Sequence, residues 1–143
     1  MNKQPFHLNI EKATLENKAY RYILYTGKYE QFVVMNIQPK DDIHMEIHEQ
    51  TDQFIRIEKG KGKAIIDDKE YELSDGIGLI IPAGTHHRII NTSETDELKL
   101  YTIYAPPEHE DGKLQEFNPD KKGGSYYNKY IKYKNKYLKL KSM

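Results

Sequence analysis

Short apolar and β-branched runs, separated by turn residues, fill the middle of the chain. Turn signals lie between them at Thr26-Gly27-Lys28, Asp67-Asp68 and Ser74-Asp75-Gly76. Several short strands with such turns predict an all-β sandwich or barrel. No helical pattern of about 10–15 residues separates the runs, which argues against βαβ units. The predicted strands are Tyr20–Tyr25, Gln31–Ile37, Ile43–His48, Asp52–Glu58, Lys63–Ile66, Glu70–Leu73, Ile77–Ile81, His87–Asn91 and Leu98–Tyr104.

The two ends of the chain lack this pattern. Residues 1–18 are polar, and we expect an arm with at most one short strand. Residues 108–124 are polar and contain Pro119 and Gly123-Gly124, which are typical of a linker. From Ser125 to Leu140 the apolar spacing becomes helical and predicts a C-terminal amphipathic helix. We therefore expect a β domain over residues 1–118, with its core in 20–105, and a linker with a basic helix over 119–143. The helical stripe consists of Tyr126, Tyr130, Tyr133, Tyr137 and Leu140.

Composition restricts the possible chemistry. The chain has 143 residues, the size of one domain, and no cysteine. It therefore has no disulfide, thiolate zinc site, iron–sulfur centre or cysteine nucleophile. No run approaches the roughly 18 apolar residues of a membrane span, and Met1–Asn9 has no apolar signal core. These features predict a cytoplasmic protein.

Charge is distributed unevenly along the chain. The formal net charge is zero, but residues 121–143 hold eight lysines and no acid, which leaves residues 1–120 with 14 basic and 22 acidic side chains. The acidic body is a poor surface for phosphates, so contact with nucleic acid or an anionic surface would come from the tail. The tail could equally be solvated, dock on the body or self-associate. It resembles the Lys/Tyr-rich tails of giant DNA virus proteins, which implies a viral origin and a place in the host cytoplasm or virion.

Glu46 and His48 are the first candidates for chemistry. They are two residues apart on a predicted strand, so both side chains face the same side, and His44 shares their parity. A carboxylate beside an imidazole inside a barrel begins a metal site or an acid/base pair. Gln53 opens the next strand and can join them. His87 starts a strand that returns into the same barrel.

Gly76, Pro82, Gly84, His87 and Asn91 follow one another at fixed spacings, and a second set of spaced residues precedes them. These two motifs make the chain resemble the cupin family. The second cupin motif, G-x5-P-x-G-x2-H-x3-N, is matched completely, and the first, G-x5-H-x-H-x3,4-E-x6-G, is matched in part. A stretch from Tyr101 to His109, Tyr-x-x-Tyr-x-Pro-Pro-Glu-His, resembles small single-domain cupins of the mannose-6-phosphate isomerase-like type. The second motif falls on Gly76, Pro82, Gly84, His87 and Asn91, and the first on Lys40, Glu46, His48, Gln53 and Gly60.

The resemblance implies a double-stranded β-helix, or jelly-roll sandwich, with a metal site at Glu46, His48, Gln53 and His87. Carboxylate, amide and imidazole donors suit Mn, Fe, Co, Ni or Zn as divalent ions. A neutral amide at Gln53 in place of the family's glutamate implies weaker binding. The expected ligand is a small polar molecule, a sugar or an organic acid, and the expected assembly is a homodimer, because exposed strand edges need covering.

Three functions remain open. A metal in the site would act as Lewis acid on a carbonyl or enediolate, as in sugar isomerisation, with Glu46 as ligand or base. The imperfect first motif favours a non-catalytic ligand-binding or structural module instead. A metal-free epimerase-type cupin would need a histidine working with a carboxylate and a tyrosine.

Other polar residues near the motifs receive a non-site interpretation first. His86 has the opposite parity to His87 and should be exposed. Asp52 should be a turn residue, and Arg56 an exposed strand residue rather than an inward anion binder. His44 is a candidate for the rim of the pocket, and the resemblance makes His109 a candidate for its lid.

Overall fold

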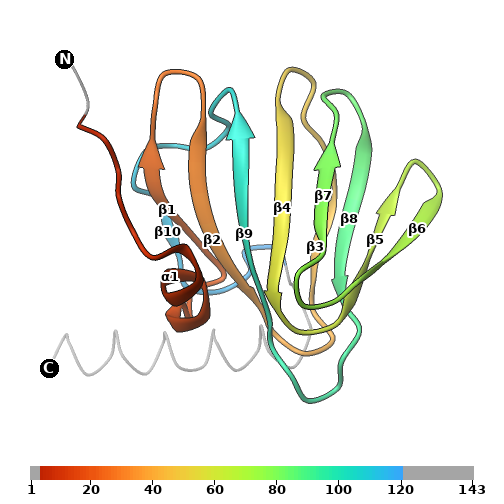
Figure 1. Ribbon diagram of the computed structural model, residues 1–143. Helices are drawn as coiled ribbons and strands as arrows, with labels where there is room; N and C mark the ends of the chain where they lie inside the picture. The colour runs from red at the N-terminus through yellow and green to blue at the C-terminus, as the bar shows by residue number, and fades with distance from the viewer. Residues whose placement is uncertain (1–3, 121–143) are drawn as a thin grey trace, which may run out of the picture.

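Two antiparallel sheets face each other in the computed structural model, which describes residues 4–120 (Figure 1). The six-stranded sheet has the order β10-β1-β2-β9-β4-β7 and the four-stranded sheet the order β3-β8-β5-β6. The predicted all-β sandwich is confirmed, and each predicted strand is present with ends that shift by at most one residue. The strands are β1 (Arg21–Thr26), β2 (Gln31–Ile37), β3 (Asp42–Ile47), β4 (Asp52–Lys59), β5 (Gly62–Ile66), β6 (Lys69–Leu73), β7 (Gly78–Ile81), β8 (His86–Asn91), β9 (Leu98–Ala105) and β10 (Leu114–Gln115).

The core lies between the two sheets. Along β4, buried Gln53, Ile55 and Ile57 alternate with more exposed neighbours, because successive side chains of a strand point to opposite faces. All of β2 is buried, since the N-terminal segment covers the outer face of the larger sheet. Burying each large aliphatic side chain stabilises the fold by about 1.5–3 kcal/mol. The fully buried core includes Ile23, Val33, Met35, Ile55, Ile57, Ile89, Leu98 and Leu100.

The N-terminal arm contains a helix, so the expectation of at most a short strand is wrong. Helix α1 (Ile10–Glu16) begins after Asn9, whose side chain accepts a hydrogen bond from the Lys12 backbone at 2.9 Å. Asparagine is a favoured residue at this position, because it satisfies an otherwise free helical N–H group. With seven residues, the helix is too short to show a helical period in the sequence.

The segment after β9 packs on the sandwich, so its interpretation as a linker is wrong up to Asn118. β10 pairs with β1 at Arg21 and Tyr22. Asn118 is buried and donates to Asp41 Oδ1 at 3.1 Å and to the Asp42 carbonyl at 2.8 Å. These long-range bonds could not be read from the polar composition. The predicted tail helix lies outside the described residues.

One end of the sandwich collects Glu46, His48, Gln53 and His87. β7 and β9 end there, at the top of Figure 1, and β4 begins there. Within residues 4–120, no helix is both long and apolar enough to span a membrane.

Candidate metal centre

A β-bulge in β3 sets the direction of Glu46. Ile43 pairs with Ile89 and Glu46 pairs with His87, so β3 advances three residues while β8 advances two. The extra residue turns Ile43 and Glu46 to the same inner face. Glu46 therefore lies directly beside His87.

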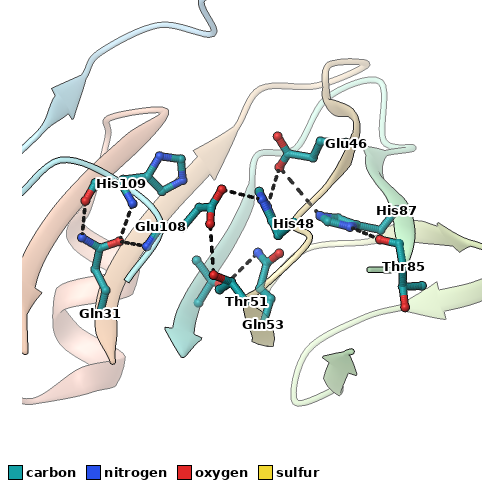
Figure 2. Close-up of polar contacts among 10 residues, drawn as sticks. Gln31, Glu46, His48, Thr51, Gln53, Thr85, His87, Glu108 and His109 are labelled. Atoms are coloured by element: carbon teal, nitrogen blue, oxygen red, sulfur yellow. Dashed lines mark hydrogen bonds and ion pairs between the residues drawn. The ribbon is translucent and has the colours of Figure 1, made fainter. Parts of the chain in front are cut away.

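His48 and His87 face the Glu46 carboxylate (Figure 2). Glu46 Oε1 lies 3.5 Å from His48 Nε2 and 3.7 Å from His87 Nε2, and the two imidazole ring centroids are 5.1 Å apart. The side chains of His48 and His87 are 7% and 1% exposed, so bulk water does not solvate them freely. One ligand atom from each of the three residues lies within 4.8 Å of the other two, which is close enough for all three to bind one ion.

The hydrogen bonds of the two imidazoles use Nδ1, so both Nε2 atoms point at Glu46. His87 Nδ1 lies 3.1 Å from the Thr85 carbonyl, which can only accept, so Nδ1 carries the proton. His48 Nδ1 lies 2.9 Å from Glu108 Oε1. Within residues 4–120, neither Nε2 has a hydrogen-bond partner. A neutral imidazole that donates from Nδ1 presents a lone pair on Nε2, which is the form that binds a metal.

The electrostatics of the cluster keep Glu46 ionised. Burial alone would raise the pKa of Glu46, but its contacts with His48 and His87 outweigh this and hold the pKa well below its usual range. Burial alone would lower the pKa of His48, but Glu46 and Glu108 outweigh it and raise this pKa. Without a cation, one proton on His48 is the favourable response to two nearby carboxylates. A metal ion would take the place of that proton.

Gln53 adds a buried amide next to the cluster. Its side-chain nitrogen donates to Thr102 Oγ1 at 3.0 Å, and its oxygen has no hydrogen-bond partner in the described part of the chain. Figure 2 shows the Gln53 amide just below the His48 ring. A buried carbonyl oxygen without a hydrogen-bond donor lowers the stability of the fold, so a cation or a donor at this position would satisfy it.

His44 does not join the cluster, which corrects the expectation from parity. The bulge between Ile43 and Glu46 breaks the alternation, and His44 is exposed. It lines a separate surface hollow of about 410 Å³ with Met45 and Arg88. A second hollow, of about 930 Å³, is lined by Lys59, Asp75, Glu97 and others, and it likewise contains none of the motif histidines.

Glu108 is a site residue that the sequence analysis missed. Its second oxygen accepts from Thr51 Oγ1 at 3.1 Å, so the carboxylate is held at both ends. Gln31 fixes the same loop, because its side chain accepts from the backbone N–H groups of Glu108 and His109 and donates to the His109 carbonyl. The signal for it in the sequence is the Pro-Pro-Glu-His stretch, in which Glu108 directly precedes His109.

Glu108→Gln should lower the affinity for a divalent metal about tenfold, because the carboxylate that orients His48 and increases its basicity becomes a neutral amide. Isothermal titration with Zn²⁺ at pH 7 measures the change. Glu110→Gln, on the same loop and exposed, is the matched control. Equal affinities for the wild type and Glu108→Gln would show that Glu108 is not a positioning residue for His48.

Of the other polar residues near the motifs, His86 is exposed, as predicted. Asp52 accepts from the Ala83 backbone at 2.8 Å and so fixes a turn, and Arg56 pairs with Glu58 rather than facing the site. His109 packs edge-on against Tyr104, with ring centroids 5.0 Å apart, and burial lowers the pKa of His109 to about 4. His109 is therefore neutral at pH 7.

The comparisons with known proteins agree with this geometry. Residues 33–104 match the family described as "Cupin domain". The chain belongs to the cupin family. At the first position of the partial motif this cupin has Lys40, whose φ of 66° is left-handed, a conformation that glycine adopts without strain. The two sheets agree with the jelly-roll sandwich expected from the resemblance.

The similar proteins span a virus and bacteria. The cupin is 45% identical to uncharacterized protein L612 of Acanthamoeba polyphaga mimivirus, over 97% of this chain and 92% of that protein. The crystal structure of BH2720 from Bacillus halodurans is 43% identical, with a TM-score of 0.76 over 79% of this chain and 89% of that one. KdgF from Halomonas sp. is 17% identical, with a TM-score of 0.58 over 62% of this chain and 78% of that one, a likeness of fold alone.

Proposed function

We propose that this cupin binds one divalent transition metal through Glu46, His48 and His87, with Gln53 as a fourth ligand, and holds a small polar molecule beside it. The observation that carries the proposal is the pair of buried Nε2 atoms on either side of one carboxylate oxygen, neither of which has a hydrogen-bond partner within residues 4–120. Buried polar atoms without partners are uncommon in native proteins, and a metal satisfies both at once. The donor set suits Mn, Fe, Co, Ni or Zn.

In such a site the metal supplies Lewis acidity toward a carbonyl or hydroxyl oxygen of the ligand. The low pKa of Glu46 suits a metal ligand better than a general acid or base, because the group stays ionised near neutral pH. The ligand class we propose is a sugar or an organic acid. A mannose-6-phosphate isomerase-like reaction is the catalytic version of the proposal, and ligand binding without turnover is the non-catalytic version.

A second candidate function uses the same histidine without a metal. His48 and Glu108 form a histidine–carboxylate pair at 2.9 Å, and the ring of Tyr104 stands perpendicular to His48 with centroids 5.6 Å apart. A metal-free epimerase-type cupin would need these three group types together. In this alternative His48 exchanges a proton with the ligand and Glu108 stabilises the charged imidazole.

Cobalt loading distinguishes the two candidates. We expect a visible Co²⁺ absorption band that saturates at one equivalent and changes when mannose 6-phosphate or malonate is added at millimolar concentration. A band that forms but responds to neither compound would refute the bound polar ligand for these two probes. Absence of the band, with proton exchange on the probes unaffected by chelator, would favour the metal-free alternative.

We also propose a homodimer formed through a strand edge. β7 is an edge strand of the larger sheet, and its Ile80 side chain is 69% exposed. An exposed apolar edge favours association with another strand. Sedimentation at tens of micromolar should give twice the 16.9 kDa chain mass, and a mass equal to that of one chain would contradict the proposal.

A further inference from the structure

Arg21 is a buried cation inside the sandwich. It lies on β1 with the same parity as the core residue Ile23, whereas Tyr22 between them is partly exposed. The residue is 6% exposed, so most of its charge is removed from water. Its guanidinium carbon lies 5.2 Å from the centre of the Tyr20 ring.

The charge of Arg21 has no carboxylate partner among residues 4–120. The other two arginines of the chain do have one: Arg88 Nε lies 2.7 Å from Asp42, and Arg56 Nε lies 3.6 Å from Glu58. Arg21 instead donates from Nη1 to the neutral amide oxygen of Gln115 at 2.7 Å, and its buried Nε has no hydrogen-bond partner within the described range. Buried charges in proteins are normally paired. The charge of Arg21 reaches Glu46 only at a distance, where it contributes to the low pKa of that carboxyl group.

Tyr104 connects the guanidinium with the candidate metal centre. Burial raises the pKa of the Tyr104 phenol, and hydrogen bonding and charge from Arg21 oppose that rise. Tyr104 in turn packs edge-on against His48 and His109. The positive charge of Arg21 also contributes, after burial, to the low pKa of His109. Arg21, Tyr104 and the two histidines therefore form one continuous polar region of the interior.

Further polar atoms in this region lack partners. The Tyr20 hydroxyl and His109 Nε2 are buried, and neither has a hydrogen-bond partner in residues 4–120. A bound divalent metal would offset the negative charge of Glu46. The positive charges of a bound divalent cation and of Arg21 would both favour an anionic ligand over a neutral sugar.

We propose that Arg21 binds the carboxylate of the ligand, so that this cupin takes a small organic acid rather than an uncharged sugar. The planar guanidinium matches a carboxylate in two parallel hydrogen bonds, and Nε is available for one of them. The Tyr20 hydroxyl supplies an additional donor nearby. The proposal rests on the proposed function in one respect, that the interior next to the metal centre is the ligand pocket.

Calorimetric titration of the full chain with malonate, malonamide and inorganic phosphate tests this inference. The wild type should bind malonate and not malonamide, its neutral analogue. Arg21→Met should weaken malonate binding about tenfold or more, because a charge-assisted pair is lost. Lys63→Met removes the same charge from a lysine outside the centre and should leave binding unchanged. Tighter binding of phosphate than of malonate would contradict the carboxylate class.

Melting temperatures separate this role from a structural one. If Arg21 serves a ligand, Arg21→Met without ligand should melt no lower than the wild type, because an unpaired buried charge is gone. Should Arg21→Met not fold, Arg21→Lys keeps the charge without the planar fork and should still bind malonate more weakly. Equal malonate affinity in the wild type and in the folded Arg21 variant would overturn the proposal.

Measuring the metal content separates the test of the carboxylate site from the test of the metal centre. The titrations are run on chelator-treated protein and again after loading with Zn²⁺. Arg21-dependent malonate binding without any retained metal would support the carboxylate site and refute the metal centre. Retained metal without malonate binding in either state would do the reverse.

Discussion

His87→Ala should lower the affinity of this cupin for Zn²⁺ by about a hundredfold or more, since the loss of a ligand exceeds the roughly 10- to 100-fold effect of removing an outer partner. The His48→Ala/His87→Ala double variant should retain no metal after desalting. The reason is geometric: each histidine points a buried Nε2 at one Glu46 oxygen, and in the described residues neither Nε2 has a hydrogen bond. Without the two histidines, the remaining carboxylate cannot hold the ion alone. Competition titration against a chromophoric chelator measures the affinities.

The neighbouring histidine provides the control. His86 is next to His87 in the chain, lies on the opposite face of β8 and is exposed. His86→Ala should therefore bind Zn²⁺ like the wild type, and circular dichroism should show that all variants keep their β-structure. If His86→Ala weakened binding as much as His87→Ala, the affinity would come from surface histidines and the assignment of the centre would be wrong.

Gly60→Ala should destabilise the fold by about 3 kcal/mol or more, because it combines a steric clash with backbone strain. Gly60 closes the first motif at a φ of 120°, where an L side chain is strained. A Cβ there would also lie 2.7 Å from the Glu97 carbonyl oxygen and 3.0 Å from Leu98 Cα, both in the backbone. Neither neighbour can rotate away. Urea unfolding measures the loss.

A second motif glycine separates the two causes. Gly84 has a φ of 81°, but within residues 4–120 no heavy atom lies within 4 Å of its ideal Cβ position. Gly84→Ala should therefore cost the strain alone, about 1–2 kcal/mol. Equal destabilisation by the two substitutions would show that the close approach of Glu97 to Gly60 contributes nothing to stability.

The strands could be predicted because their signals are local. Alternation and turn residues predicted Gln31–Ile37 with its correct bounds and placed the Asp67-Asp68 turn, where both residues have positive φ. The motif spacing brought His48 and His87 together because β3 and β8 are paired, and that pairing also placed Glu46 beside His87. Patterns of period 2 and fixed spacings carry this information in the chain itself.

The rest of the site depends on features without a local signal. The bulge that excludes His44 is one extra residue in a strand, and the sequence Ile43–His48 shows no break. Glu108 reaches His48 across 60 positions of the chain, and Arg21 meets Gln115 across 94. Contacts of that separation are set by the packing of whole elements. The hydrogen bonds of Asn118 were missed for the same reason.

The metal content of the protein tests the central claim most directly. The wild type is loaded with Mn²⁺, Fe²⁺, Co²⁺, Ni²⁺ or Zn²⁺ in turn, desalted, and analysed by inductively coupled plasma mass spectrometry beside the His48→Ala/His87→Ala variant. The account predicts close to one ion per chain for at least one of these metals and none for the variant. A wild type that retains none of the five would contradict the metal centre and would leave the His48–Glu108 pair as an acid–base site.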